Sequence, residues 1–207
     1  YYGSFLQSKM HAAGVRCSTC HDPHGLKPGA PGNQLCVQCH SPTQPVDRHG
    51  VDTSKLLRKD YDSPEHHFHT QGERGSFCVD CHAPPKTYMQ VDPRRDHSFR
   101  VPRPDLSVKL GTPNACTSCH ADHDAQWSTE AVVRWYGDQP RPEHYGETLQ
   151  AARRGSPGAV ERLARLVQDA ATPAIVRATA LSLFTRYPGA SAARALTAAL
   201  DDPEPLV

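Results

Sequence analysis

Hydrophobic periodicity divides this chain into two parts of different character. Beyond residue 123, apolar side chains recur every three to four positions, which is the spacing of one face of an α-helix. Trp127, Ala131 and Trp135 predict a first helix over 124–136. Upstream, only residues 4–13 show a comparable apolar face. We therefore predict little regular secondary structure and short α-helices in the first part, and an all-α second part.

Three more helices are predicted downstream. Ser156-Pro157 has the order of an N-cap followed by a proline in the first turn, and Thr172-Pro173 repeats that order. Ser191 is the N-cap candidate of the third helix. The apolar stripes of these helices are Val160, Leu163, Ala164 and Val167; Val176, Ala180, Leu183 and Phe184; and Leu196, Ala199 and Leu200.

A weak internal repeat accompanies these helices. Asp169-Ala-Ala-Thr-Pro173-Ala-Ile-Val is similar to Asp201-Asp-Pro203-Glu-Pro-Leu-Val207, and the two prolines are 30 residues apart. Such a period is typical of helical solenoids, and the pattern resembles HEAT repeats. Because each repeat needs a neighbour, we expect an incomplete solenoid that continues in a longer gene product or packs on another part. The predicted domains are 1–123 and a HEAT-like 124–207.

All eight cysteines lie in four copies of the motif Cys-x-x-Cys-His. The copies are Cys17/Cys20/His21, Cys36/Cys39/His40, Cys78/Cys81/His82 and Cys116/Cys119/His120. This motif is the attachment signature of c-type haem, in which two thioethers hold the porphyrin and the adjacent histidine binds the iron as proximal ligand. The motif therefore predicts four covalently bound haems c.

The cysteine spacing alone is compatible with two other interpretations. The spacing from Cys17 to Cys39 also fits a zinc ribbon, and eight cysteines in a secreted chain could form four disulfides. Neither requires a histidine directly after each cysteine pair. At the histidine content of this chain, four such placements by chance have a probability of about one in 10^5.

Composition supports a cofactor-rich first part. The chain has 37% hydrophobic and 7% aromatic residues, with 19 prolines and 13 histidines. So polar a segment would be disordered without a cofactor, and four macrocycles would supply its core. About thirty residues per haem cannot bury each porphyrin, so haem edges should lie near one another, which suits electron transfer. The formal charge of +1 includes no basic block typical of nucleic-acid binding, and no apolar run is long enough for a transmembrane segment.

The remaining histidines are candidates for the sixth, distal iron ligands. Nine histidines are left after the proximal four, whereas the chain has only two methionines. Histidine on both sides keeps the iron six-coordinate at low potential. We predict that His11, His24, His69 and His97 are the distal ligands, with His67 as the alternative to His69. His24 follows its proximal ligand too closely to bind the same haem, so it should bind a neighbouring one. Four arginines are candidates to pair with haem propionates: Arg94, Arg95, Arg100 and Arg103.

The first two motifs together resemble the doubled CxxCH module of bacterial multihaem cytochromes. The resemblance is carried by Cys17-Ser-Thr-Cys20-His21-Asp-Pro-His24-Gly, followed by Leu35-Cys-Val-Gln-Cys-His40. A longer run resembles the C-terminal haem segment of larger periplasmic or extracellular multihaem cytochromes, which often carry HEAT or TPR repeats downstream. This longer run of the present chain extends from Phe5-Leu-Gln-Ser-Lys-Met through Phe77-Cys-Val-Asp-Cys-His and Arg94-Arg-Asp-His-Ser to Asn114-Ala-Cys-Thr-Ser-Cys-His.

This resemblance implies electron transfer outside the cytoplasm, with redox proteins or further copies of the chain as partners, including copies in a conductive filament. Because haem c is attached outside the cytoplasm, we expect that a leader has been removed. The alternative is a multihaem oxidoreductase of the nitrite or hydroxylamine type with one open haem, although its CxxCK motif is not found in the sequence. A third interpretation is a scaffold whose HEAT-like part binds a partner.

Overall fold

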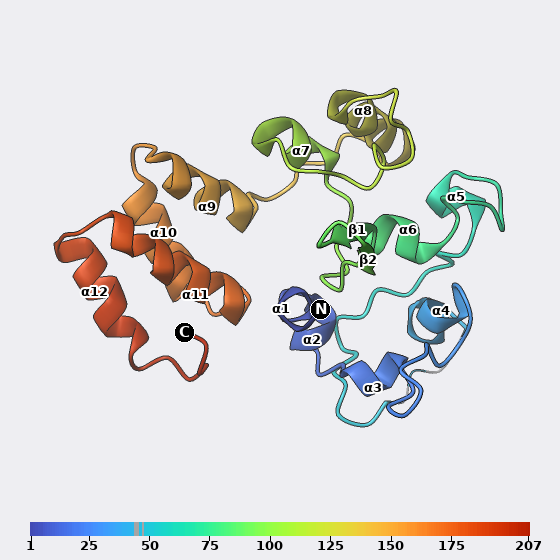
Figure 1. The fold of residues 1–207 in the computed structure, drawn as a ribbon, viewed down its shortest axis with the longest axis horizontal. Coiled ribbons are helices and arrows are strands. Elements are labelled where there is room, and N and C mark those ends of the chain that lie inside the picture. Colours follow the sequence, from blue (N-terminus) through green and yellow to red (C-terminus); the bar gives the residue numbers. More distant parts are fainter. Residues whose placement is uncertain (44–45, 47) are drawn as a thin grey trace. The chain divides into compact units, whose positions relative to one another are not determined.

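The computed structural model describes residues 1–43, 46 and 48–207 (Figure 1). The described residues form two compact units, Tyr1–Gly137 and Asp138–Val207. The first unit thus ends after Gly137 rather than after residue 123, where the sequence suggested a boundary. The physical reason is that the helix α8 (Ala125–Tyr136) packs against α7 (Pro104–Leu110) and buries Ala131 and Val132.

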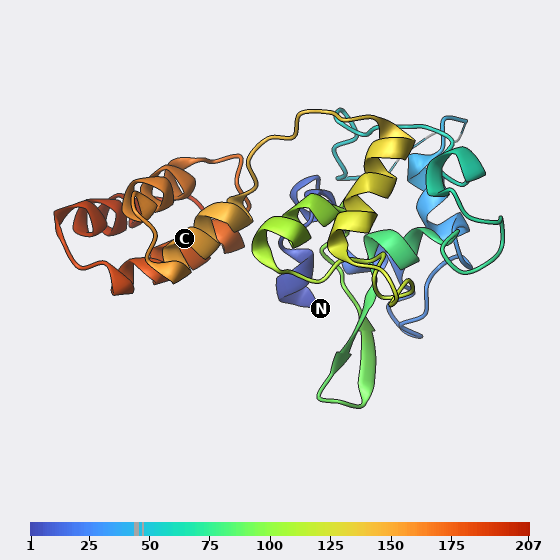
Figure 2. The ribbon, with the colours of Figure 1, turned by 90° about the horizontal axis from the view of Figure 1, so that it is seen from above.

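The first unit consists of short helices joined by irregular segments and one hairpin. Its other elements are α1 (Tyr2–Phe5), α2 (Lys9–Ala12), α3 (Cys17–Cys20), α4 (Gln34–His40), α5 (Pro64–His67), α6 (Cys78–His82), β1 (Pro85–Tyr88) and β2 (Asp92–Arg95). β1 and β2 are antiparallel, with Pro85 opposite Arg95, and the hairpin projects from the unit in Figure 2. The helix predicted over 4–13 forms as two helices, because the Ser8 side chain accepts a hydrogen bond from the His11 N–H and caps α2.

The apolar core of the first unit is small. Its described buried hydrophobic residues are Phe5, Ala83, Leu106, Ala131 and Val132. A unit of this length normally depends on a larger apolar interior. The chain of this unit therefore has little apolar interior of its own.

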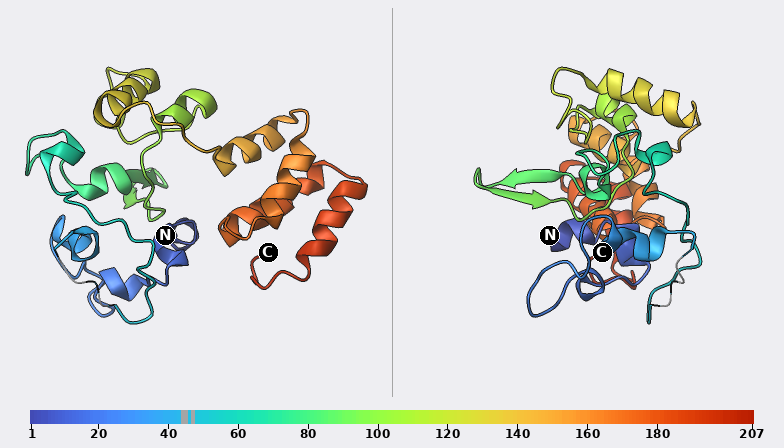
Figure 3. Two further views of the ribbon diagram at one scale, coloured as in Figure 1. Left: turned by 180° about the vertical axis from the view of Figure 1, so that it is seen from behind. Right: turned by 90° about the vertical axis from the view of Figure 1, so that its right-hand side faces the viewer.

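The second unit is all helical. It contains α9 (Tyr145–Arg154), α10 (Ala159–Gln168), α11 (Ala174–Leu183), the 3₁₀ turn η1 (Phe184–Arg186) and α12 (Ala190–Ala199). α10 packs against α9, α11 and α12, and lies beside α11 in Figures 1 and 3. α9 was not predicted, because its sequence is largely polar; a capping box between His144 and Glu147 begins it and Gly155 in the left-handed region ends it.

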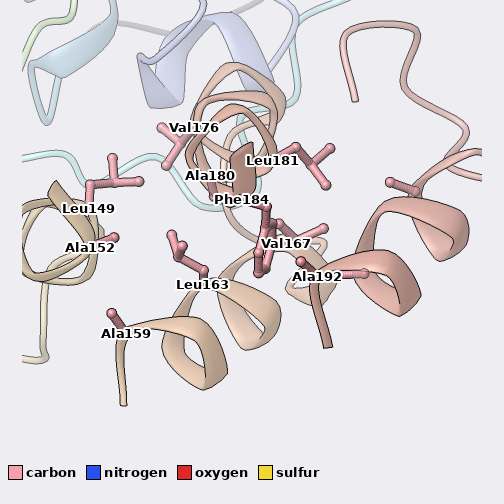
Figure 4. Packing of buried hydrophobic residues seen from close by; sticks show 12 residues of the cluster. Leu149, Ala152, Ala159, Leu163, Val167, Val176, Ala180, Leu181, Phe184 and Ala192 are labelled. Carbon is pink, nitrogen blue, oxygen red and sulfur yellow. The ribbon is translucent and has the colours of Figure 1, made fainter. Parts of the chain in front are cut away.

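Apolar side chains from all four helices form the core of the second unit (Figure 4). Leu163 and Ala180 are fully buried, and Phe184 is only 2% exposed. The Arg177 guanidinium of α11 donates a hydrogen bond to the Asp202 carboxylate, which follows α12. Helices α10, α11 and α12 formed where the sequence predicted helices, but the predicted N-caps Ser156, Thr172 and Ser191 were wrong, because Gly158, Pro173 and Gly189 take these positions. Leu196 and Leu200 of the third predicted stripe are 44% and 84% exposed, and Ala192, Ala195 and Ala199 are the core residues of α12. The HEAT-like assignment stays a prediction. No helix in the described part of the chain has the length and apolar character needed to cross a membrane.

Candidate haem-binding site

Each Cys-x-x-Cys-His motif forms one helical turn. In the first motif the His21 N–H donates to the Cys17 carbonyl at 2.9 Å, and in the fourth the His120 N–H donates to the Cys116 carbonyl at 2.9 Å. The second and third motifs lie within α4 and α6. Residues three and four apart share a face of a helix. The turn therefore places both thiols and the imidazole of each motif on the same side.

All eight cysteines are free thiols in this structure, so none is paired in a disulfide. Cys17 and Cys119 are exposed and the other six are half-buried. Among the residues that the structure describes, no three or more His, Cys, Asp or Glu side chains form a cluster that could hold a metal ion.

The four motifs lie next to one another in the order of the sequence. Burial raises the pKa of Cys20, and the nearby thiols Cys36 and Cys39 of the second motif raise it further. The thiols of Cys36 and Cys78, from the second and third motifs, lie close enough to shift each other's pKa, which is lowered for Cys36 and raised for Cys78. Burial raises the pKa of Cys81 to about 11, with a contribution from Cys116 of the fourth motif. Neighbouring motifs are therefore close enough for their charges to interact.

Three of the four proximal histidines face a second imidazole. The ring centroids are 6.3 Å apart for His21 and His97, 6.2 Å for His82 and His66, and 6.1 Å for His120 and His69. A metal–imidazole bond is about 2.0–2.1 Å long and the ring centre lies about 1.1 Å beyond the nitrogen, so two imidazoles on opposite sides of one metal have centroids about 6.3 Å apart. Each of the three pairs therefore has the spacing expected of two imidazoles that would bind the same iron from opposite sides.

Hydrogen bonds to the backbone orient these imidazoles. The Nδ1 atoms of His21, His82 and His97 lie 2.9, 2.9 and 3.0 Å from the carbonyl oxygens of Leu26, Arg100 and Arg95, respectively. A ring whose Nδ1–H donates to a carbonyl presents an unprotonated Nε2, which is the atom that binds a metal. The residues present therefore fit axial ligation of a haem iron.

His66 was not among the predicted ligands, although it faces His82 with an angle of only 3° between the rings. Burial lowers the pKa of His66, and the nearby His82 lowers it further, so the neutral form that binds metals is favoured. His66 and His69 face different proximal histidines because Phe68, between them, turns the chain in the left-handed conformation at φ 54°. The signal in the sequence was the cluster of three histidines, which we expected to supply one ligand.

His67, the predicted alternative to His69, lies differently. It is 9% exposed, and its Nε2 lies 2.9 Å from the Gln71 side-chain oxygen. Its Nδ1 accepts a hydrogen bond from the His69 N–H at 3.2 Å. Both ring nitrogens thus have partners in the chain, which leaves His69 as the residue of this pair that faces a proximal imidazole.

His123 is also near His120, with ring centroids 6.4 Å apart. Its ring, however, stacks on Trp127 at 4.1 Å with an angle of 4°, and its Nε2 lies 3.6 Å from the Asp122 carboxylate. A histidine three residues after the proximal ligand is confined to the same side of the motif. His69, which comes from a distant segment, is the better candidate for the opposite side.

His40 has different surroundings from the other three proximal histidines. Its Tyr61 neighbour meets it edge-on at 6.4 Å, and burial lowers its pKa. Within residues 1–43, 46 and 48–207, no second imidazole faces it. Of the two remaining predicted ligands, His11 rests edge-on against Phe5 and His24 is exposed, so both assignments stay predictions.

The end of α8 holds the segment that supplies His66 and His69. The Phe68 ring stacks on Trp135 at 4.7 Å with an angle of 3°, and the Tyr136 hydroxyl donates a hydrogen bond to the His66 carbonyl. On the other side, Gly75 leaves room for the His69 ring, because a Cβ there would lie 2.5 Å from the ring. Sequence reasoning missed these supports, since they join distant parts of the chain.

The four arginines proposed for propionates each have a partner within the chain. Arg94 pairs with Asp92 at 2.6 Å, Arg95 with Asp80 at 3.2 Å and Arg103 with Asp105 at 2.7 Å. Arg100 donates a hydrogen bond to the Ser98 hydroxyl at 3.1 Å. Their assignment to propionates stays a prediction.

Comparison with known families connects this geometry to a class of protein. The family model described as the doubled CXXCH motif matches residues 10–45, which contain the first two motifs. Searches of curated proteins and of solved structures gave no match. The doubled motif indicates covalent binding of haem c and electron transfer, so this part of the chain is a c-type cytochrome-like module.

Proposed function

We propose that the first unit binds four haems c and carries electrons from one haem to the next. The thioethers form at Cys17 and Cys20, Cys36 and Cys39, Cys78 and Cys81, and Cys116 and Cys119. The observation that carries the proposal is the spacing of the three imidazole pairs, which matches two ligands on one iron. Two of these pairs belong to the third and fourth motifs, beyond the stretch that the family model covers.

In this proposal each proximal histidine has one distal partner. His97 serves the haem of His21, His66 that of His82, and His69 that of His120. The haem of His40 takes either His11 or His24, the two predicted ligands that remain. Imidazole on both sides favours a low potential and fills the coordination sphere. When bound, the haem supplies one-electron chemistry, and the chain supplies orientation, burial and charge around it.

The proposed location is periplasmic or extracellular, because haem c is attached outside the cytoplasm. The proposed partners are redox proteins or further copies of this chain. Each haem adds two propionates to a chain of formal charge +1, so the holoprotein is acidic. Complementary basic patches on a partner would speed association at low ionic strength.

The test uses the chain produced with its haems attached in the periplasm of a bacterial host. Intact mass counts the haems, and we expect four. The reduced absorption spectrum is then recorded with and without carbon monoxide, and sharp c-type bands that ignore carbon monoxide are expected. A response from about a quarter of the haem signal would indicate one open iron and favour the oxidoreductase alternative.

The distal ligand of the haem attached at the second motif is tested separately with His11→Ala and His24→Ala. Exactly one of these variants should convert about a quarter of the haem signal to a form that binds carbon monoxide. If neither variant does so, and the wild-type protein also ignores carbon monoxide, the proposed choice between His11 and His24 is wrong.

A further inference from the structure

Asn33 forms hydrogen bonds with both the second and the third attachment motif. It directly precedes α4, which carries Cys36 and Cys39, and it is only 9% exposed. Its side-chain oxygen accepts a hydrogen bond from the Cys78 N–H at 2.8 Å. Its amide nitrogen donates to the Ser76 carbonyl at 2.9 Å and to the Asp62 carboxylate at 2.6 Å. One buried carboxamide thus ties the start of α4 to the first cysteine of α6.

This role differs from that of an ordinary helix cap. Asn33 is the N-cap residue of α4, but its side chain makes no capping hydrogen bond to that helix. Asn114 directly precedes the fourth motif and makes an ordinary capping bond. Its side-chain oxygen accepts a hydrogen bond from the Thr117 N–H of that motif at 3.1 Å. The Asn33 side chain instead reaches residues 29 to 45 positions away. Its bonds therefore serve the junction between two motifs rather than one helix end.

The two motifs that Asn33 joins also meet through their cysteines. The Asn33 carbonyl accepts a hydrogen bond from the Cys36 N–H at 2.9 Å, and its side-chain oxygen accepts one from the Cys78 N–H, so both cysteines are bonded to this one residue. The two thiols lie close enough to shift each other's pKa. Both sulfurs are attachment points for porphyrins under the proposed function. With both haems attached, the edges of two different macrocycles would lie next to each other at these two cysteines.

A chain of hydrogen bonds continues from Asn33 to the segment that carries the distal ligands. The Asp62 carboxylate accepts a second hydrogen bond from Gln71 at 3.0 Å, and the Gln71 oxygen lies 2.9 Å from His67 Nε2. His67 in turn accepts from the His69 N–H. This network is partly buried, and its buried end is the Asn33 side chain. Because polar networks are costly to leave partly satisfied, loss of the Asn33 carboxamide should disturb Asp62 and Gln71.

We propose that Asn33 is a positioning residue that holds the second and third haem-attachment motifs together, so that electrons pass between these haems at the contact of Cys36 and Cys78. In this step one electron leaves the iron of one haem and reaches the iron of the other, which is reduced as the first is oxidised. No bond forms or breaks, and no further reactant is needed. The inference rests on the proposed four-haem function.

The contact itself is tested on the wild-type holoprotein. In the fully reduced state, low-spin bis-histidine haems are diamagnetic, so proton NMR can detect contacts between them. We expect a nuclear Overhauser cross-peak between the thioether protons at Cys36 and those at Cys78. If intact mass shows four haems and this cross-peak is absent, the inference is wrong while the proposed function stands. If fewer than four haems are attached, the proposed function fails on its own.

The role of Asn33 is tested with Asn33→Asp, Asn33→Ala and the control Asn114→Ala. Asn33→Asp keeps the shape and the acceptor for Cys78, but it loses both donors and places a second carboxylate beside Asp62. We expect both Asn33 variants to keep four haems, to lose the Cys36–Cys78 cross-peak and to shift the midpoint potentials of two haems. Asn114→Ala should keep the cross-peak.

A double variant separates positioning from a general loss of stability. Asn33→Asp combined with Asp62→Asn restores the hydrogen bond between positions 33 and 62 with donor and acceptor exchanged. We expect this pair to recover the cross-peak and the wild-type potentials at least in part. An unchanged cross-peak and unchanged potentials in both single Asn33 variants would overturn the assignment.

Discussion

The imidazoles of His66 and His82 are parallel within 3°, with their centroids 6.2 Å apart. They come from different helices, α5 and α6. His82 is oriented by the Arg100 carbonyl, and the backbone at His66 is held by the Tyr136 hydroxyl. This pair therefore depends on contacts with two further segments, and it leads to the first of the following predictions.

His66→Ala should open one side of the third haem. We expect about a quarter of the haem signal to become high-spin and to bind carbon monoxide, because removal of one axial imidazole leaves a five-coordinate iron. The control is His67→Gln, which keeps a polar side chain next to Gln71 and should leave the spectrum low-spin. The opposite result, with a high-spin signal in His67→Gln alone, would show that His67 is the ligand.

Gly75→Ala should displace the distal ligand of the fourth haem. A Cβ at this position would lie 2.5 Å from the His69 ring, and the backbone is left-handed at φ 94°. Gly72 shares the left-handed conformation at φ 83° but has open space around its Cβ position. Both alanine variants should lose about 1–2 kcal/mol of stability, but only Gly75→Ala should produce a carbon monoxide-binding species. An equal spectral effect of both variants would contradict the role of the ring contact.

Trp135→Ala should loosen the segment that supplies two distal ligands. The stacked contact between Trp135 and Phe68 would be lost, which costs about 3–5 kcal/mol for a large aromatic residue in a core and less for this half-buried one. We expect the carbon monoxide-binding fraction to rise in the haems of both His82 and His120. Arg134→Ala, at an exposed position of the same helix, is the control and should behave as wild type.

Leu163→Ala should destabilise the second unit. Leu163 is fully buried among the four helices, and removal of such a side chain costs about 2–5 kcal/mol. Leu196→Ala, at a position that is 44% exposed, should change the free energy of unfolding far less. Chemical denaturation of the holoprotein, followed by far-ultraviolet circular dichroism, measures both values. Equal losses in the two variants would argue against the observed core.

Asp202→Asn should change the acid stability of the second unit. The hydrogen bond from Arg177 lowers the pKa of Asp202, so the folded state binds this proton more weakly than the unfolded state. The resulting stability is fully present above the ordinary aspartate pKa of about 3.9 and is lost as the pH falls through the lower pKa of the folded state. Wild type should therefore lose more stability than Asp202→Asn between pH 5 and pH 2, by circular dichroism. The exposed Asp201→Asn serves as control and should follow wild type.

Local sequence was enough to define the chemistry of the first unit. The order of Cys17, Cys20 and His21 requires only one helical turn to bring two thiols and an imidazole to one side. The same holds for the apolar stripes of α10 and α11, because the period of a helix is set by the backbone alone. Such features involve residues within one or two helical turns of each other and can be deduced without knowledge of the fold. The third stripe failed, because its Leu196 and Leu200 are exposed and the alanines of α12 face the core.

Pairing of histidines depended on contacts between distant segments. His66, His67 and His69 have the same side chain in nearly the same local sequence, yet His66 faces His82, His69 faces His120 and His67 is buried in hydrogen bonds. The left-handed turn at Phe68 and the stacking of its ring on Trp135 separate these roles. Neither feature can be predicted from the order of the histidines, because both arise when α8 packs near a segment that is remote in the chain. The motifs thus indicate where haem c attaches, and the tertiary structure decides which imidazoles lie opposite each other.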